Sequence, residues 1–177
     1  RRFMEVQQSE DVFRENAEEL RLLLREAYVG GIEVKLMVPP SHAWHWHTLW
    51  LSGLWPRFEA MKRLLVDINA EEAARASRQP YAVWDFSGAY GPALEPPAAK
   101  GGTMKWFWEP VHYKRALGDA LLSRMMGTAT PGIPGGENFG VRLDSESLES
   151  HLGRLRALQA GYAVSHPNDV ARIRELV

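Results

Sequence analysis

The stretch IEVKLMV, residues 32–38, gives the clearest strand signal in the chain. Apolar side chains at every second position from Ile32 to Val38 alternate with Glu33 and Lys35, and this period of two is typical of a β-strand. The two prolines that follow lack backbone donors, so the strand is expected to end at Val38. A second β-prone run, YAVWDF at residues 81–86, is ended by the Ser-Gly pair that follows it.

Segments with helical periodicity lie on both sides of these runs. Residues 9–27 place apolar side chains on one stripe, with Ser9 as a candidate N-cap and Gly30-Gly31 as a stop. Pro56 suits a first helical turn, and residues 114–126 predict a third helix. Two more helices are expected near the carboxyl end, the last one capped by Asn168 or Asp169. Apolar positions that mark the predicted helices are Phe13, Ala17, Leu20, Leu24, Phe58, Met61, Leu65, Ile68, Leu148, Leu152 and Leu155.

The order of these elements predicts an α/β fold. Helix, strand, helix, strand, long loop and helix favour a small parallel sheet flanked by helices, with SGNH/flavodoxin-like layers. Two strands make a thin sheet, so further strands are expected from the chain, from residues outside it, or from a partner chain. Residues 1–127 are expected to form the core, with 128–177 as a helical extension packed on the same domain.

Composition excludes several classes of protein. A chain of 177 residues with 45% hydrophobic content is the size of one compact domain. The net charge of −1 gives no positive field for nucleic acid, so no nucleic-acid partner is expected. No cysteine is present, which removes disulfides, thiolate nucleophiles and cysteine metal sites. No apolar run reaches the length of a membrane span, and the chain as given is expected to be soluble.

The stretch MKWFWEPVHYKRALGDALLSRMMG, residues 104–127, carries the main catalytic candidates. A carboxylate at Glu109 that accepts from one nitrogen of His112 leaves the other nitrogen free to take a proton from a hydroxyl nucleophile. The alternative is that Glu109 occupies a first helical turn, where the helix dipole favours an acid. Trp108 and Tyr113 flank the pair as candidate substrate contacts.

Other polar residues follow the two predicted strands. Ser41 and Ser87 come after strand ends, where ligands bind in open parallel sheets, but both also suit turns that bond to their own backbone. Asp85 could position a substrate hydroxyl or cap the turn at Ser87. His42 begins a cluster, SHAWHWH, that allows a histidine-based metal site, although no single regular structure aims all three imidazoles at one point.

The segments WFWEPVHYKRALGDALLSRMMG, IEVKLMVPPSHA and WDFSGAY resemble the carboxyl-terminal half of SGNH/GDSL-type proteins of bacterial exopolysaccharide loci. The resemblance covers roughly residues 28 to 127. In that superfamily an acid three positions before a histidine closes a Ser-His-acid triad. The resemblance therefore implies that His112 is the general base and Glu109 its orienting acid, although the family usually has aspartate there.

The same resemblance implies a function. It points to acyl transfer or ester hydrolysis on O-acetyl groups of a cell-envelope polysaccharide, without a cofactor, in the periplasm or cell envelope. The family's serine lies in a Gly-Asp-Ser-like turn that this sequence lacks, so the nucleophile is expected outside the chain. Candidate substrate contacts are Ser41, His42, Asp85, Ser87, Trp108 and Tyr113. The alternative function is a noncatalytic carbohydrate-binding or assembly module.

Overall fold

A computed structural model describes residues 10–99, 102–128, 132–133 and 139–177. Within these residues the chain forms an α/β unit of six α-helices, one short 3-10 helix and three strands. In chain order the elements are α2 (Glu10–Gly30), β1 (Lys35–Val38), α3 (Ala43–Leu51), α4 (Trp55–Arg75), β2 (Ala82–Asp85), η1 (Gly91–Leu94), α5 (Arg115–Met125), β3 (Val141–Leu143), α6 (Leu148–Ser165) and α7 (Pro167–Arg174).

The sheet is small and mixed. Its strand order is β1-β2-β3, with β1 parallel to β2 and β2 antiparallel to β3. Val38 at the end of β1 lies opposite Asp85 at the end of β2, so the carboxyl ends of these two strands share one edge. The expected parallel pairing is confirmed for β1 and β2. The expectation of a purely parallel sheet is wrong, because β3 returns in the opposite direction.

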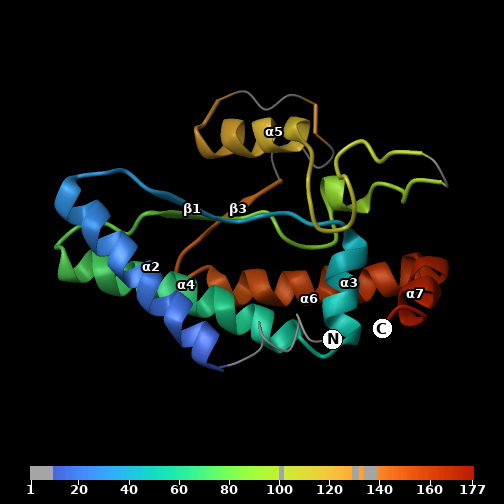
Figure 1. Cartoon of the computed structure of the whole chain (residues 1–177), viewed down its shortest axis with the longest axis horizontal. Coiled ribbons are helices and arrows are strands. Elements are labelled where there is room, and N and C mark those ends of the chain that lie inside the picture. Colours follow the sequence, from blue (N-terminus) through green and yellow to red (C-terminus); the bar gives the residue numbers. More distant parts are fainter. Residues whose placement is uncertain (1–9, 100–101, 129–131, 134–138) are drawn as a thin grey trace.

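Helices cover both faces of the sheet. Figure 1 shows α5 on one side of the strands and α2, α4 and α6 on the other, with α3 and α7 together at one end. The side chains between the sheet and α5 form one apolar cluster, which includes Phe86, Phe107, Leu117, Leu121 and Phe139. A second cluster under the sheet joins β2, β3, α4 and α6 and consists of Val66, Val83, Leu143, Leu148 and Leu152. The α/β class with a small sheet is therefore confirmed.

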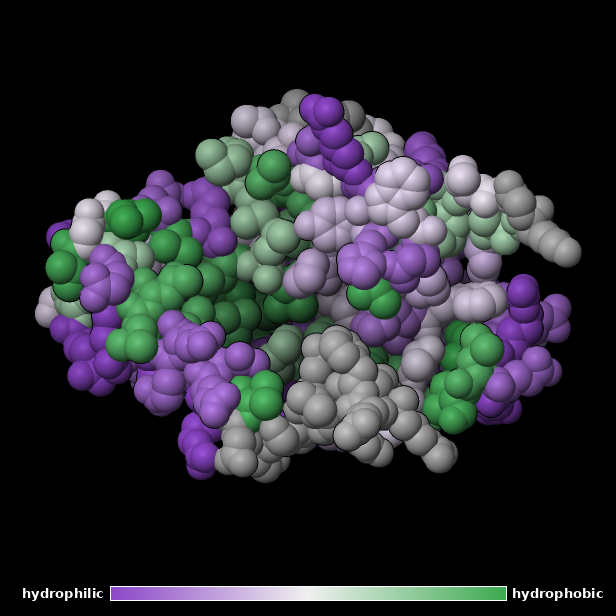
Figure 2. Space-filling model, viewed as in Figure 1, coloured by the Kyte–Doolittle hydropathy of each residue, from purple (hydrophilic) through white to green (hydrophobic). Residues whose placement is uncertain are grey.

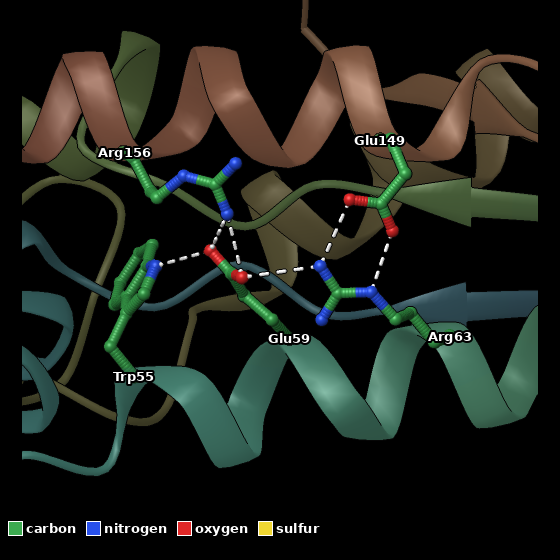
Figure 3. A network of polar contacts seen from close by, with 5 residues as sticks. All are labelled: Trp55, Glu59, Arg63, Glu149 and Arg156. Atoms are coloured by element: carbon green, nitrogen blue, oxygen red, sulfur yellow. Dashed lines mark hydrogen bonds and ion pairs between the residues drawn. The ribbon is translucent and has the colours of Figure 1, made fainter.

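A polar network fastens α4 to α6. Glu59 accepts from the Trp55 indole at 2.9 Å and from Arg156 at 2.7 and 2.8 Å, while Arg63 binds Glu149 at 2.6 and 3.0 Å (Figure 3). The Glu59 side chain is 8% exposed, whereas that of Glu149 is 63% exposed. The network therefore runs from the interior to the surface along the seam between the two helices.

The strands are shorter than the sequence pattern predicts. β1 begins at Lys35, because the N–H of Ile32 still donates to the Ala27 carbonyl of α2 at 2.8 Å and Gly31 turns the chain with a φ of 64°. β2 loses Tyr81, whose N–H donates to the side chain of Asn69 instead. The predicted N-cap Ser9 lies outside the described residues.

Two elements escape the sequence pattern, and one predicted cap is wrong. The apolar side chains of α3 are spread around the helix, so its periodicity is faint, and β3 has only three residues. α7 begins at Pro167, so Asn168 and Asp169 lie inside its first turn, and the N-cap position belongs to His166.

Candidate functional site

Glu109 and His112 lie in a tight turn and not in the first turn of a helix. An isolated antiparallel bridge joins Phe107 to Tyr113, and the N–H of Trp108 donates to the His112 carbonyl at 2.8 Å. α5 begins later, at Arg115. The alternative in which Glu109 occupies a first helical turn is therefore wrong, because the hairpin-like pairing sets the conformation of residues 107–113.

The carboxylate of Glu109 is oriented by the backbone of its own turn. It accepts from the N–H of Val111 at 2.8 Å and from the N–H of His112 at 2.9 Å, and it also contacts Nδ1 of the His112 ring. Partial desolvation acts to raise the pKa of Glu109, but the Val111 N–H and the His112 ring outweigh it and lower that pKa overall. The side chains of His112 and Glu109 are 78% and 46% exposed. The pair is thus held together and open to solvent.

The segment that follows β1 lies against the same turn. The N–H of His42 donates to the Pro110 carbonyl at 2.9 Å, and the hydroxyl of Ser41 donates to the Val111 carbonyl at 3.4 Å. Within the described residues, no serine hydroxyl is hydrogen-bonded to the ring of His112. Ser41 is therefore near the turn, but it is buried and its hydroxyl is directed to the Val111 carbonyl.

His42 has both ring nitrogens engaged. Its Nδ1 accepts from the N–H of Trp44 at 3.2 Å, which caps α3, so Nε2 carries the proton and donates to the Glu95 carbonyl at 2.8 Å. Burial lowers the pKa of His42, with the Glu95 carbonyl opposing this effect. A neutral, doubly bonded imidazole accounts for this residue structurally, and its assignment as a substrate contact stays a prediction.

The two aromatic candidates differ in exposure. Trp108 is 69% exposed, and the ammonium of Lys114 lies 4.8 Å from its ring centroid. Tyr113 is half-buried and packs against Gly118 and the cluster beneath α5. Only Trp108 of these two offers a broad aromatic face to solvent beside Glu109.

Asp85 and Ser87 belong to a separate, buried polar cluster at the end of β2. Lys62 of α4 lies 2.6 Å from Asp85 Oδ2 and donates to the Ser87 hydroxyl at 2.6 Å, while His151 of α6 donates through Nε2 to the same carboxylate at 2.9 Å. Arg154 can only donate, so Nδ1 of His151 accepts its hydrogen bond at 2.9 Å. The cluster ties α4 and α6 to one strand end.

Charge and burial in this cluster favour structure over catalysis. Burial acts to raise the pKa of Asp85, but the His151 hydrogen bond and the Lys62 charge outweigh it and lower the pKa to about 2. The side chains of Lys62 and Asp85 have no exposed surface, and Ser87 is fully buried. The Ser87 N–H also donates to Asp85 Oδ1 at 2.8 Å, which is the turn-capping arrangement. Substrate contact by Asp85 and Ser87 stays a prediction, since solvent does not reach either side chain.

Lys62 and His151 were not among the sequence candidates. The sequence does hint that Lys62 is buried, because it follows Phe58 of the apolar stripe by one helical turn. A buried lysine requires a partner of opposite charge. His151 lies between Leu148 and Leu152, at positions that one face of α6 buries. The sequence could suggest that both are buried, but it could not pair them with Asp85.

The histidines of residues 42–47 do not converge. They lie at and within the start of α3, where successive residues turn by about 100°, and they meet different neighbours. Nδ1 of His47 is hydrogen-bonded to the Gln159 amide, and His45 lines an apolar groove. Among the described residues, no group of three or more His, Asp or Glu side chains is arranged to hold a metal ion.

The chain matches no family model, no curated protein and no solved structure. In the part of the chain that the structure describes, no helix has the length and apolar character to cross a membrane.

Proposed function

We propose that Glu109 and His112 are the acid–base pair of a site for acyl transfer or ester hydrolysis on an O-acetylated carbohydrate. The observation that supports this proposal is the contact between the Glu109 carboxylate and Nδ1 of His112, together with the open position of the ring. A carboxylate at Nδ1 fixes the tautomer in which Nε2 can accept a proton. The class of substrate follows the resemblance to SGNH-type proteins.

In this mechanism a hydroxyl nucleophile attacks the acyl carbon while His112 removes its proton. Glu109 keeps the imidazole oriented and stabilises the imidazolium that forms, and His112 then returns the proton to the departing sugar oxygen. Two backbone N–H groups hold the Glu109 carboxylate, so its aim does not depend on the histidine alone. A serine nucleophile is expected outside the chain, and Ser41, which contacts the same turn, is the candidate within it.

The test is hydrolysis of p-nitrophenyl acetate and of an acetylated oligosaccharide by the chain and by its variants. His112→Ala should lower turnover by about 10²- to 10⁴-fold, the usual contribution of a general base. Glu109→Gln should also lower turnover, while His166→Ala, a histidine on the far carboxyl-terminal segment, should leave it unchanged. Equal rates for the His112 and His166 variants would remove the basis of the proposal.

Ser41→Ala locates the nucleophile in the same assay. A loss as large as that of His112→Ala would place the nucleophile in this chain, after a shift of the Ser41 hydroxyl away from the Val111 carbonyl. Unchanged turnover would instead exclude Ser41 and leave water, or another hydroxyl of the chain, as the group that His112 deprotonates in this assay. Circular dichroism of each variant separates loss of catalysis from loss of fold.

The second candidate is carbohydrate binding without catalysis. The 69% exposed ring of Trp108, beside the carboxylate of Glu109, favours it, because sugars stack on open aromatic faces. A chain that binds an acetylated oligosaccharide but does not hydrolyse it, and that loses binding on Trp108→Ala and not on His112→Ala, would favour this reading.

A further inference from the structure

The sheet ends at β1 with an unpaired edge. β1 has β2 as its neighbour on one side and, among the described residues, no strand on the other. The Val38 carbonyl accepts from the Phe86 N–H at 3.0 Å, so the backbone groups of Val38 point toward β2. Because N–H and C=O groups alternate sides along a strand, those of Lys35 and Met37 point toward the open edge.

An apolar groove lies along this edge. Its volume is about 630 Å³, and Met37, Val38 and Pro39 contribute to its lining. The other walls come from α2, the α3–α4 region and α4, and include Phe13, Ala17, Leu20, Leu49, Leu54, Phe58, Met61, Leu64 and Leu65. Figure 2 shows hydrophobic atoms gathered in a recess on the same face of the molecule. The open backbone groups of β1 therefore adjoin a mostly apolar surface.

The wall supplied by α4 is the apolar stripe of that helix. Phe58, Met61 and Leu65 follow helical spacing, and each is only partly buried. The stripe that α4 buries instead carries Glu59 and Lys62, which hold the polar networks described above. α4 thus lines the groove with partly buried apolar side chains, while its buried face combines apolar residues such as Trp55 and Val66 with the charged Glu59 and Lys62.

We propose that β1 and this groove bind an extended segment of another polypeptide as an added strand. Main-chain hydrogen bonds to Lys35 and Met37 would satisfy the open edge, and apolar side chains at alternate positions of the segment would fill the groove. A fatty acyl chain fits the apolar walls but leaves the backbone groups of β1 without partners, which costs free energy in a dry groove. This surface is separate from the Glu109–His112 pair, so the inference does not depend on the proposed function.

The probe is a synthetic peptide of about eight residues with alternating valine and threonine and a glutamate at each end. Its matched control has the same side chains but N-methylated valines, which cannot donate to a neighbouring strand. Fluorescence anisotropy should show saturable binding of the probe, with the N-methylated control weaker by about tenfold or more. Amide exchange at Met37 should slow in the complex, while exchange at Val83, which lies within the sheet, should not change.

Variants of the edge and of the groove test the same site from the protein side. Met37→Pro removes the outward N–H and should weaken binding by about tenfold, whereas Met37→Ala keeps that N–H, loses only side-chain contact with the groove, and should weaken binding less. If Met37→Pro does not fold, Met61→Lys serves instead, because it places a charge in the groove wall at a partly buried position. Its binding should be weaker by a similar factor.

Several results would overturn the proposal. Absence of saturable peptide binding is one, and equal affinity for the peptide and its N-methylated control is another. Binding of decanoate that Met37→Pro leaves unchanged, without peptide binding, would assign the groove to an acyl chain. A concentration-dependent dimer that Met37→Pro abolishes, again without peptide binding, would assign the edge to a second copy of this chain.

Discussion

At the scale of single residues, the chain has two clusters of polar side chains, one exposed and one buried. Glu109 and His112 share a contact on an open turn, where solvent reaches them. Asp85, Lys62 and His151 share contacts in the interior, where neither solvent nor substrate does. The same residue types therefore have different uses, and exposure is what separates a candidate acid–base pair from a structural ion pair.

The buried carboxylate makes stability depend on pH. The pKa of Asp85 is about 2 in the folded chain and near 3.8 without its partners, so the folded state favours the ionised form. The stabilisation is fully present above the unfolded value and is lost as pH falls toward the folded value. We expect the free energy of unfolding, measured by urea titration, to drop between about pH 4 and pH 2.

Asp85→Asn is the matched test of this pH dependence. The variant should be less stable at pH 7, because Lys62 loses its buried partner, and its free energy of unfolding should fall less steeply below about pH 4. Asp67→Asn, an exposed aspartate on α4, serves as the control and should keep the wild-type slope. Parallel slopes for the wild type and Asp85→Asn would show that another carboxyl group governs the acid transition.

At the scale of elements, α4 is the helix on which the fold depends. One of its faces meets the sheet and α6 through Glu59 and Lys62, and the other lines the groove with α2. α2 and α4 also pack along their length, and an ion pair of Arg25 with Glu72, at 2.7 Å, joins them. α4 therefore connects the groove, the sheet and α6.

The network between α4 and α6 contains both a buried carboxylate, Glu59, and an exposed one, Glu149, so their contributions to stability can be compared. Glu59→Ala removes the acceptor for Trp55 and Arg156 and should destabilise the chain by about 1–3 kcal/mol. Glu149→Ala removes an exposed partner of Arg63 and should cost about 0–1 kcal/mol. Urea unfolding of both variants measures the difference. A Glu149 variant as unstable as the Glu59 variant would contradict the role assigned to burial.

At the scale of the whole molecule, the carboxyl-terminal segment belongs to the core. β3 adds the third strand of the sheet, and α6 supplies Leu152 and Leu155 to two apolar clusters and His151 to the buried ion pair. Gly140, just before β3, has a φ of 83°, and a Cβ there would lie 2.2 Å from the ring of Phe86. The backbone thus enters β3 in direct contact with the cluster under α5.

Truncation tests how far the two regions depend on each other. A chain of residues 1–127 lacks β3 and α6, which exposes Val66 and Val83 and leaves Asp85 without His151. We expect no cooperative thermal transition in circular dichroism for this fragment, while the full chain unfolds cooperatively. A fragment with its own sharp transition would show that residues 1–127 fold independently of the extension.

The sequence alone determined the α/β class, the cores of β1 and β2 and most helices, because alternation and helical periodicity are local properties of the chain. It also brought Glu109 and His112 together, since three residues of separation in a turn suffice for contact. The tertiary structure decided what depends on distant residues: the antiparallel return of β3, the pairing of Asp85 with Lys62 and His151, and the incomplete burial of Phe58, Met61 and Leu65 on α4. Those features arise from residues up to 89 positions apart, as between Lys62 and His151 of the same cluster, which local patterns cannot relate.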